Sequence, residues 1–175
     1  MSIRLLIDGY NLIGAYGLMR NKNLEDERNG LIKKLCEYKK IKNYEITVVF
    51  DGTGNSSPFE GGDRMGGISI IYSRIGESAD DLIKRIVKDS GSGEGFIVVT
   101  SDREISGFCS GYNATVISSG EFKSRLEMAS FYQNKDFDDD EENGYLPLHI
   151  STKKKGNPRK LSKTERQKKS KLRKL

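Results

Sequence analysis

The sequence predicts an α/β fold with a mostly parallel sheet, and two patterns support this class. Short apolar runs rich in β-branched residues recur along the first two thirds of the chain, and amphipathic segments of helical period separate them. Strands that alternate with helices build parallel sheets with right-handed crossovers. A chain of 175 residues is long enough for one such domain and a tail.

Five strands are expected, at residues 3–7, 45–50, 68–72, 96–99 and 114–117. The first is an apolar run that ends in Asp8 and Gly9, which is typical of a strand buried on both faces. The fifth has the weakest pattern. Residues 52–67 are rich in glycine, contain one proline and have little apolar content, so we expect a loop between the second and third strands.

Four helices are expected between and after these strands. Asn23 can cap the first, because three acidic residues suited to a first turn and an apolar stripe of period 3.6 follow it. Ser78 can cap the second. The third begins near Asp102, and the fourth is capped around Ser118 or Ser119.

Charge divides the chain into three parts. The net charge is +5, yet residues 153–175 hold twelve Lys and Arg against one Glu, and residues 136–142 hold six acids. The remainder is neutral overall. We therefore expect a domain at 1–133, an acidic linker at 134–152, and a basic tail at 153–175 that is disordered alone and could become helical on a partner.

Three of the predicted strands are followed closely by an aspartate, and the second helix opens with two more. These residues are Asp8, Asp51, Asp102, Asp80 and Asp81. The carboxyl ends of parallel strands meet at one edge of the sheet, where ligands bind in open α/β folds. Carboxylates gathered there repel one another unless a cation joins them, and oxygen ligands suit Mg²⁺ or Mn²⁺. We expect a metal site at this edge.

Within this site we expect Asp8, Asp80 and Asp102 to hold the metal, with Asp51 in the outer shell or on a second metal. Such a metal activates water and neutralises charge on a phosphodiester. Two further residues, Asn11 and Ser101, could orient a ligand or a phosphate. Structural alternatives remain for two acids: Asp51 precedes Gly52 in a common turn signal, and Asp81 is better explained as a supporting residue that stabilises a helix N-terminus.

Four segments in order resemble one known family. They read Asp-Gly-Tyr-Asn-Leu at 8–12, Val-Phe-Asp-Gly at 49–52, Ser-Ala-Asp-Asp-Leu-Ile at 78–83 and Thr-Ser-Asp-Arg-Glu-Ile at 100–105. This pattern resembles the YacP-like branch of the NYN domain ribonucleases, which are relatives of the PIN-domain nucleases. The resemblance runs from residue 3 to about 132, and the glycine-rich loop and the basic tail lie outside it.

The resemblance implies a PIN-like three-layer fold with a central, mostly parallel five-stranded sheet, a divalent-metal site, and cleavage of single-stranded RNA. The acids of the family fall on Asp8, Asp51, Asp80 and Asp102, and its amide falls on Asn11. Every expected ligand is present, so the resemblance implies an active enzyme.

Basic residues predict RNA contacts at two places. Near the acids these are Arg64, Arg74, Lys84 and Arg103, and in the tail they are Lys153, Lys154, Lys155, Arg159 and Lys160. The tail has no aromatic residue on which bases could stack, so it suits the backbone of structured RNA such as the ribosome's. The alternative is a solubilising tail that pairs with the acidic run.

The sequence therefore predicts a metal-dependent endoribonuclease. A non-catalytic RNA- or ribosome-binding protein on the same fold is the main alternative, and a metal-dependent phosphatase of small substrates is a third. No phosphate-binding glycine motif, zinc cluster or histidine triad is indicated. The lack of a signal pattern or membrane-length apolar run predicts a cytoplasmic protein. The oligomeric state stays open.

Overall fold

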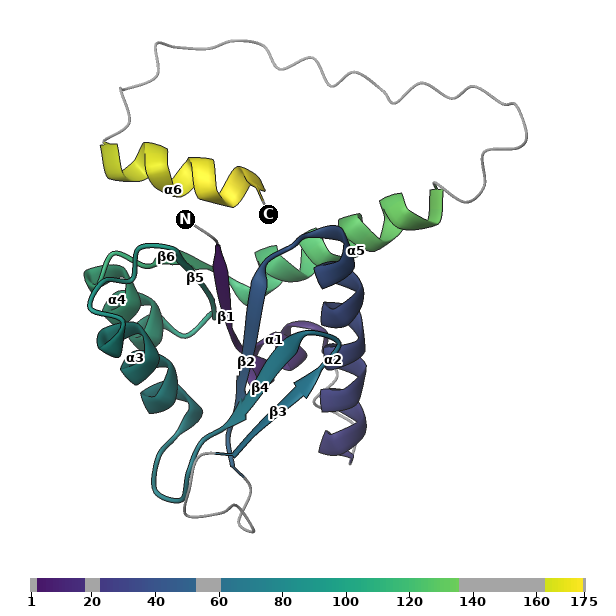
Figure 1. Cartoon of the computed structure of the whole chain (residues 1–175), viewed down its shortest axis with the longest axis horizontal. Coiled ribbons are helices and arrows are strands. Elements are labelled where there is room, and N and C mark those ends of the chain that lie inside the picture. Colours follow the sequence, from purple (N-terminus) through teal and green to yellow (C-terminus); the bar gives the residue numbers. More distant parts are fainter. Residues whose placement is uncertain (1–2, 18–22, 53–60, 136–162, 175) are drawn as a thin grey trace. The chain divides into compact units, whose positions relative to one another are not determined.

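A computed structural model describes residues 3–17, 23–52, 61–135 and 163–174 (Figure 1). The chain divides into two compact units, Met1–Ser130 and Phe131–Leu175. None of the helices in the described ranges is long and apolar enough to span a membrane. The second unit contains α6 (Lys163–Lys174), whose sequence is rich in strong helix formers.

The first unit is built on a six-stranded sheet in the order β3-β4-β2-β1-β5-β6. The strands are β1 (Arg4–Asp8), β2 (Glu45–Phe50), β3 (Gly61–Met65), β4 (Ile68–Tyr72), β5 (Phe96–Val99) and β6 (Thr115–Ile117). All neighbouring strands pair in parallel except β3, which is antiparallel to β4. The predicted α/β class and mostly parallel sheet are confirmed.

The edge strand β3 corrects the prediction of five strands, because it lies in the segment that was expected to be a loop. It pairs with β4 from Gly61↔Tyr72 to Met65↔Ile68. The turn between them uses Gly66 and Gly67, whose φ angles of 58° and 80° suit glycine. Glycine is depleted in strands, so the composition of this segment concealed its pairing. Residues 53–60 of the expected loop lie outside the described part of the chain.

Helices cover both faces of the sheet (Figure 1). They are α1 (Gly9–Ala15), α2 (Leu24–Ile41), α3 (Ala79–Asp89), α4 (Arg103–Gly111) and α5 (Ser119–Lys135). The four predicted helices are all present, with Asn23, Ser78 and Asp102 as the N-caps of α2, α3 and α4. The short helix α1, directly after β1, was not predicted.

Successive side chains of the central strands point to opposite faces of the sheet, so the core has one part on each face. Leu6 of β1 packs in a cluster with Leu82 of α3 and Ile105 of α4. On the opposite face, the ring of Tyr38 in α2 meets that of Phe122 in α5 edge to face, with centroids 5.6 Å apart. This packing holds the helices on both faces against the sheet. The carboxyl ends of β1, β2 and β5 therefore form a rigid edge that can position side chains.

Candidate active site

Asp8 ends β1 and is held from two directions. Its Oδ1 accepts a hydrogen bond from the backbone N–H of Asn11 at 3.1 Å, which makes Asp8 the N-cap of α1. Its Oδ2 accepts one from the Thr100 hydroxyl, also at 3.1 Å. The side chain is only 6% exposed. Asp8 is therefore a positioned, nearly buried carboxylate at the end of the central strand.

Three of the four predicted acids meet at one cavity of about 470 Å³. Asp8, Asp51 and Asp80 line it, together with Asn11 and Ser101. Their positions follow from the topology, since β1 and β2 are parallel neighbours and α3 begins beside the end of β2. The sequence-based expectation that these acids converge at the strand ends agrees with this arrangement.

Asp102 lies outside the wall of this cavity. Its Oδ1 accepts hydrogen bonds from the backbone N–H groups of Glu104 at 2.7 Å and Ile105 at 3.0 Å, so it caps α4. Its charge nevertheless contributes to raising the pKa of Asp80. Asp102 therefore acts on the cavity through its field, and its capping role accounts for its position after β5.

Asp51 and Asp81 both take part in the start of α3. Asp51 Oδ1 accepts a hydrogen bond from the backbone N–H of Ala79 at 2.6 Å, which joins the end of β2 to this helix. Asp81 and Ser78 form a reciprocal cap: the backbone N–H of Asp81 donates to Ser78 Oγ, whose hydroxyl donates to Asp81 Oδ2 at 2.8 Å. The helix-stabilising interpretation of Asp81 agrees with this cap.

Burial and the charges of neighbouring carboxylates make two acids of the cavity, Asp8 and Asp80, hard to ionise. Burial raises the pKa of Asp8 to about 6, the charges of Asp80 and Asp51 add to the rise, and the hydrogen bonds from Asn11 and Thr100 oppose it. Burial also raises the pKa of Asp80, as do the charges of Asp102 and Asp51, whereas Lys84 lowers it. A bound cation would relieve this excess of negative charge.

The donor set of the cavity suits a hydrated divalent cation. Among the described residues, no group of three or more His, Cys, Asp or Glu side chains is close enough to hold a metal ion together. Magnesium has a smaller requirement, because it keeps several waters and is bound through one or two carboxylates and the phosphates of a substrate. The carboxylate oxygens of the lining and the raised pKa values of Asp8 and Asp80 fit an ion of this kind.

Asn11 is oriented by two donors that the sequence patterns did not pair with it. Its Oδ1 accepts hydrogen bonds from the backbone N–H of Ser101 at 2.9 Å and from the hydroxyl of Ser119 at 2.7 Å. With the carbonyl oxygen engaged, the amide NH₂ is the group that can donate to a ligand in the cavity. Thr100 and Ser119, both buried, were missed, although Thr100 directly precedes the predicted Ser101.

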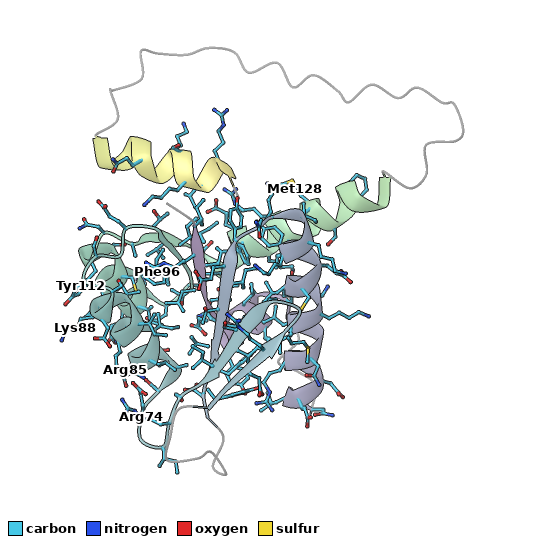
Figure 2. All side chains as sticks on the ribbon, viewed as in Figure 1. Arg74, Arg85, Lys88, Phe96, Tyr112 and Met128 are labelled. Atoms are coloured by element: carbon cyan, nitrogen blue, oxygen red, sulfur yellow. The ribbon has the colours of Figure 1, made fainter. Side chains whose placement is uncertain are left out.

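The predicted RNA-contacting cations near the acids differ in their pairing. Arg74 bonds Glu77 at 3.1 Å, and Figure 2 shows Arg74 near Arg85, which shares that carboxylate. Lys84 bonds Glu104 at 2.5 Å. The remaining two, Arg64 on β3 and Arg103 on α4, are exposed. The predicted contacts Lys153, Lys154, Lys155, Arg159 and Lys160 lie outside the described residues.

Removing the hydroxyl next to Asp8 should raise the pKa of that carboxyl further. In Thr100→Val, Asp8 loses one of its two hydrogen bonds, and a bond to a charged group contributes about 1.5–3 kcal/mol. We expect the pKa to rise by about one unit or more. A carboxyl-carbon NMR titration of metal-free protein measures it, with Thr100→Ser as the matched control that keeps the hydroxyl. Identical titrations for both variants would contradict this account.

Comparison with known proteins gives one family. The sequence model of the YacP-like NYN domain matches residues 5–174. Uncharacterized protein YacP of Bacillus subtilis (strain 168) is 30% identical over 87 residues, which are 48% of this chain and 51% of that protein. The chain thus spans about half the length of this curated relative. Because the family match reaches residue 174, the expectation that the tail lies outside the family pattern is wrong.

Two solved structures share the fold. Crystal structures of Rae1 (YacP) from Bacillus subtilis, one of them a mutant, each align with a TM-score of 0.61. Their identities are 26% and 25%, and the alignments cover 76% and 78% of this chain and 80% of each Rae1 chain. The mostly parallel sheet between two helical layers is therefore the PIN-like fold that the resemblance implied. The chain belongs to the YacP-like NYN domain family.

Proposed function

We propose that this protein is a divalent-metal-dependent endoribonuclease that hydrolyses phosphodiester bonds of single-stranded RNA. Its family makes it a nuclease-like, RNA-related protein. The observation that carries the proposal is the convergence of Asp8, Asp51 and Asp80 on one cavity, where burial and neighbouring carboxylates raise the pKa of Asp8 and of Asp80. A site of this kind favours a cation and, through it, a phosphodiester.

In the proposed mechanism, Asp8 and Asp80 would hold a Mg²⁺ or Mn²⁺ ion, and Asp51 and Asp102 would support it from further away. When bound, such an ion activates a water and stabilises charge on the phosphate. Thr100 keeps Asp8 oriented and favours its ionised form. The NH₂ group of Asn11 donates to an oxygen of the scissile phosphate. Cleavage would leave a 5′-phosphate and a 3′-hydroxyl.

The basic tail is proposed to bind the backbone of a structured RNA, such as that of the ribosome. Seven of the twelve residues of α6 are Lys or Arg, with a single Glu among them. Such a helix binds polyphosphate with an affinity that falls steeply with salt. It would bring the nuclease domain to its RNA, in the cytoplasm, without reading a base sequence.

A non-catalytic RNA- or ribosome-binding protein is the second candidate, and one observation favours it. Asp8 and Asp102 cap helices, and Asp51 bonds the first turn of α3, so all three have structural roles that need no metal. Binding of RNA without cleavage in Mg²⁺ or Mn²⁺ would support this candidate.

The neighbouring residues Asp80 and Asp81 allow a matched test of the proposed nuclease. Asp80 lines the acidic cavity, whereas Asp81 is engaged in the cap of α3. We expect the full chain to cut end-labelled single-stranded RNA in Mn²⁺ or Mg²⁺ and to stop in EDTA. Asp80→Asn should reduce the rate at least about 100-fold, because even outer-shell changes cost 10–100-fold, and Asp81→Asn should stay within a few-fold of wild type.

Circular dichroism and RNA affinity should be unchanged in Asp80→Asn. Equal rates for the two variants would place the chemistry elsewhere. Hydrolysis of nucleotide monomers that is unaffected by deleting residues 153–175 would instead support the phosphatase alternative.

A further inference from the structure

A second cavity, of about 420 Å³, lies between α2 and the β3–β4 hairpin. Its wall includes Arg28, Arg64 and Tyr72, two acids, Glu25 and Asp63, and apolar Ile70. Two arginines are thus balanced by two carboxylates. A neutral wall gives little general attraction for phosphate, so a ligand here would have to be held by shape and stacking.

Aromatic contacts connect this second cavity to the acidic one. Tyr10 lines the acidic cavity, and its ring meets that of Phe50 edge to face at 5.2 Å. Phe50 in turn stacks on Tyr72 at 5.9 Å, with an angle of 26° between the rings. The guanidinium of Arg28 lies over the Tyr72 ring, 5.8 Å from its centroid. Burial raises the pKa of Tyr10, and the charge and hydrogen bond of Arg28 oppose this rise. Arg28 therefore contacts one residue from each cavity.

The ring of Tyr72 is held in place and partly exposed. Phe50 beneath it is fully buried, so it cannot move aside, while Tyr72 itself is only half-buried at the cavity wall. An anchored aromatic ring with a guanidinium over it forms a group on which the bases of a single strand stack, largely regardless of sequence. Arg64, exposed on the edge strand β3, can bond an adjoining phosphate.

We propose that this second cavity is a base-stacking subsite, in which Tyr72 and Arg28 hold a nucleotide of the same single-stranded RNA whose scissile phosphate lies in the acidic cavity. The inference rests on the proposed function, because only that function requires the bound RNA to run from this subsite to the acidic cavity. It adds a recognition element on the α2 face of the sheet, carried by stacking rather than by net charge. Binding there should therefore persist as salt is raised.

Affinity for a short, 5′-fluorescein-labelled single-stranded RNA, measured by anisotropy in EDTA, tests the subsite without cleavage. Tyr72→Ala should bind about tenfold more weakly at both low and high salt, because base–aromatic stacking contributes about 1–3 kcal/mol per base. Tyr72→Phe should bind like wild type. The control is Tyr112→Ala, whose half-buried ring lies at the end of α4 on the other face of the sheet (Figures 1 and 2). Wild-type affinity in Tyr72→Ala, or equal losses in the two alanine variants, overturns the proposal.

A second measurement does not depend on the alanine variant folding. The chain has no tryptophan, so Tyr72→Trp places a single tryptophan reporter at the subsite, and Tyr112→Trp places its control. RNA should quench the first and leave the second unchanged. If wild type cleaves RNA but RNA does not quench Tyr72→Trp, the proposed subsite is wrong and the proposed nuclease activity is unaffected. If RNA quenches Tyr72→Trp but no metal supports cleavage, the proposed nuclease activity is wrong and a stacking site for single-stranded RNA remains.

Discussion

Replacing Asp8 by asparagine should stabilise the metal-free protein at neutral pH and abolish cleavage. The folded-state pKa of Asp8 is about 6, above its ordinary value of 3.8. A carboxyl of this kind binds its proton more tightly in the folded state, so its contribution to stability is present below pH 3.8 and is lost as the pH rises to about 6. At pH 7 the ionised group costs on the order of 3 kcal/mol relative to its neutral form.

Asparagine avoids that cost because it stays neutral at every pH. Its carbonyl oxygen can still accept the N–H of Asn11, and asparagine is as good an N-cap as aspartate. We expect Asp8→Asn to raise the free energy of unfolding at pH 7 by about 1–3 kcal/mol, with the difference shrinking toward pH 4. The cleavage rate should fall at least about 100-fold, because the ligand charge is lost.

Urea unfolding in EDTA at several pH values measures this difference. The matched control is Asp89→Asn, an exposed carboxylate at the end of α3, which should change stability by less than about 0.5 kcal/mol. A variant that is less stable than wild type at pH 7 would show that Asp8 is retained for the fold and not for a ligand.

The convergence of the acids could be predicted because it follows from one rule of parallel sheets. Asp8 and Asp51 each follow a strand, and Asp80 lies in the first turn of the helix that starts beside them, so local patterns were sufficient to bring them together. Asp102 follows β5 in the same way but caps α4. Asp8 shows that one residue at a strand–helix junction can both cap a helix and line the cavity, so only the folded structure shows that Asp102 caps its helix without lining the cavity.

Contacts between distant segments could not be predicted from local patterns. Thr100 lies 92 positions from Asp8, and Ser119 lies 108 positions from Asn11, yet each donates its hydroxyl directly to that residue. Serine and threonine occur in most turns, so neither had a distinguishing signal. The β3 strand was hidden for a related reason, since its stability comes from pairing with β4 and not from its own composition.

Adding one methyl group at Gly9 should disrupt the site through the core. A Cβ there would lie 2.2 Å from the ring of Phe50, far inside van der Waals contact. That ring is fully buried and packed between Tyr10 and Tyr72, so it has no space into which to turn. We expect Gly9→Ala to destabilise the protein by about 1–3 kcal/mol, as overpacking does.

Gly30→Ala separates this clash from the general preference of helices for alanine. Gly30 lies in α2 with open space where its Cβ would be, so this variant should gain about 1 kcal/mol. The temperatures of thermal unfolding of the two variants should therefore shift in opposite directions. A gain in both would show that the ring of Phe50 moves aside at little cost.

Because Gly9 joins Asp8 to the helix that carries Asn11, a displaced α1 separates the carboxylate from the amide. Cleavage by Gly9→Ala should consequently fall even at temperatures where the protein is fully folded.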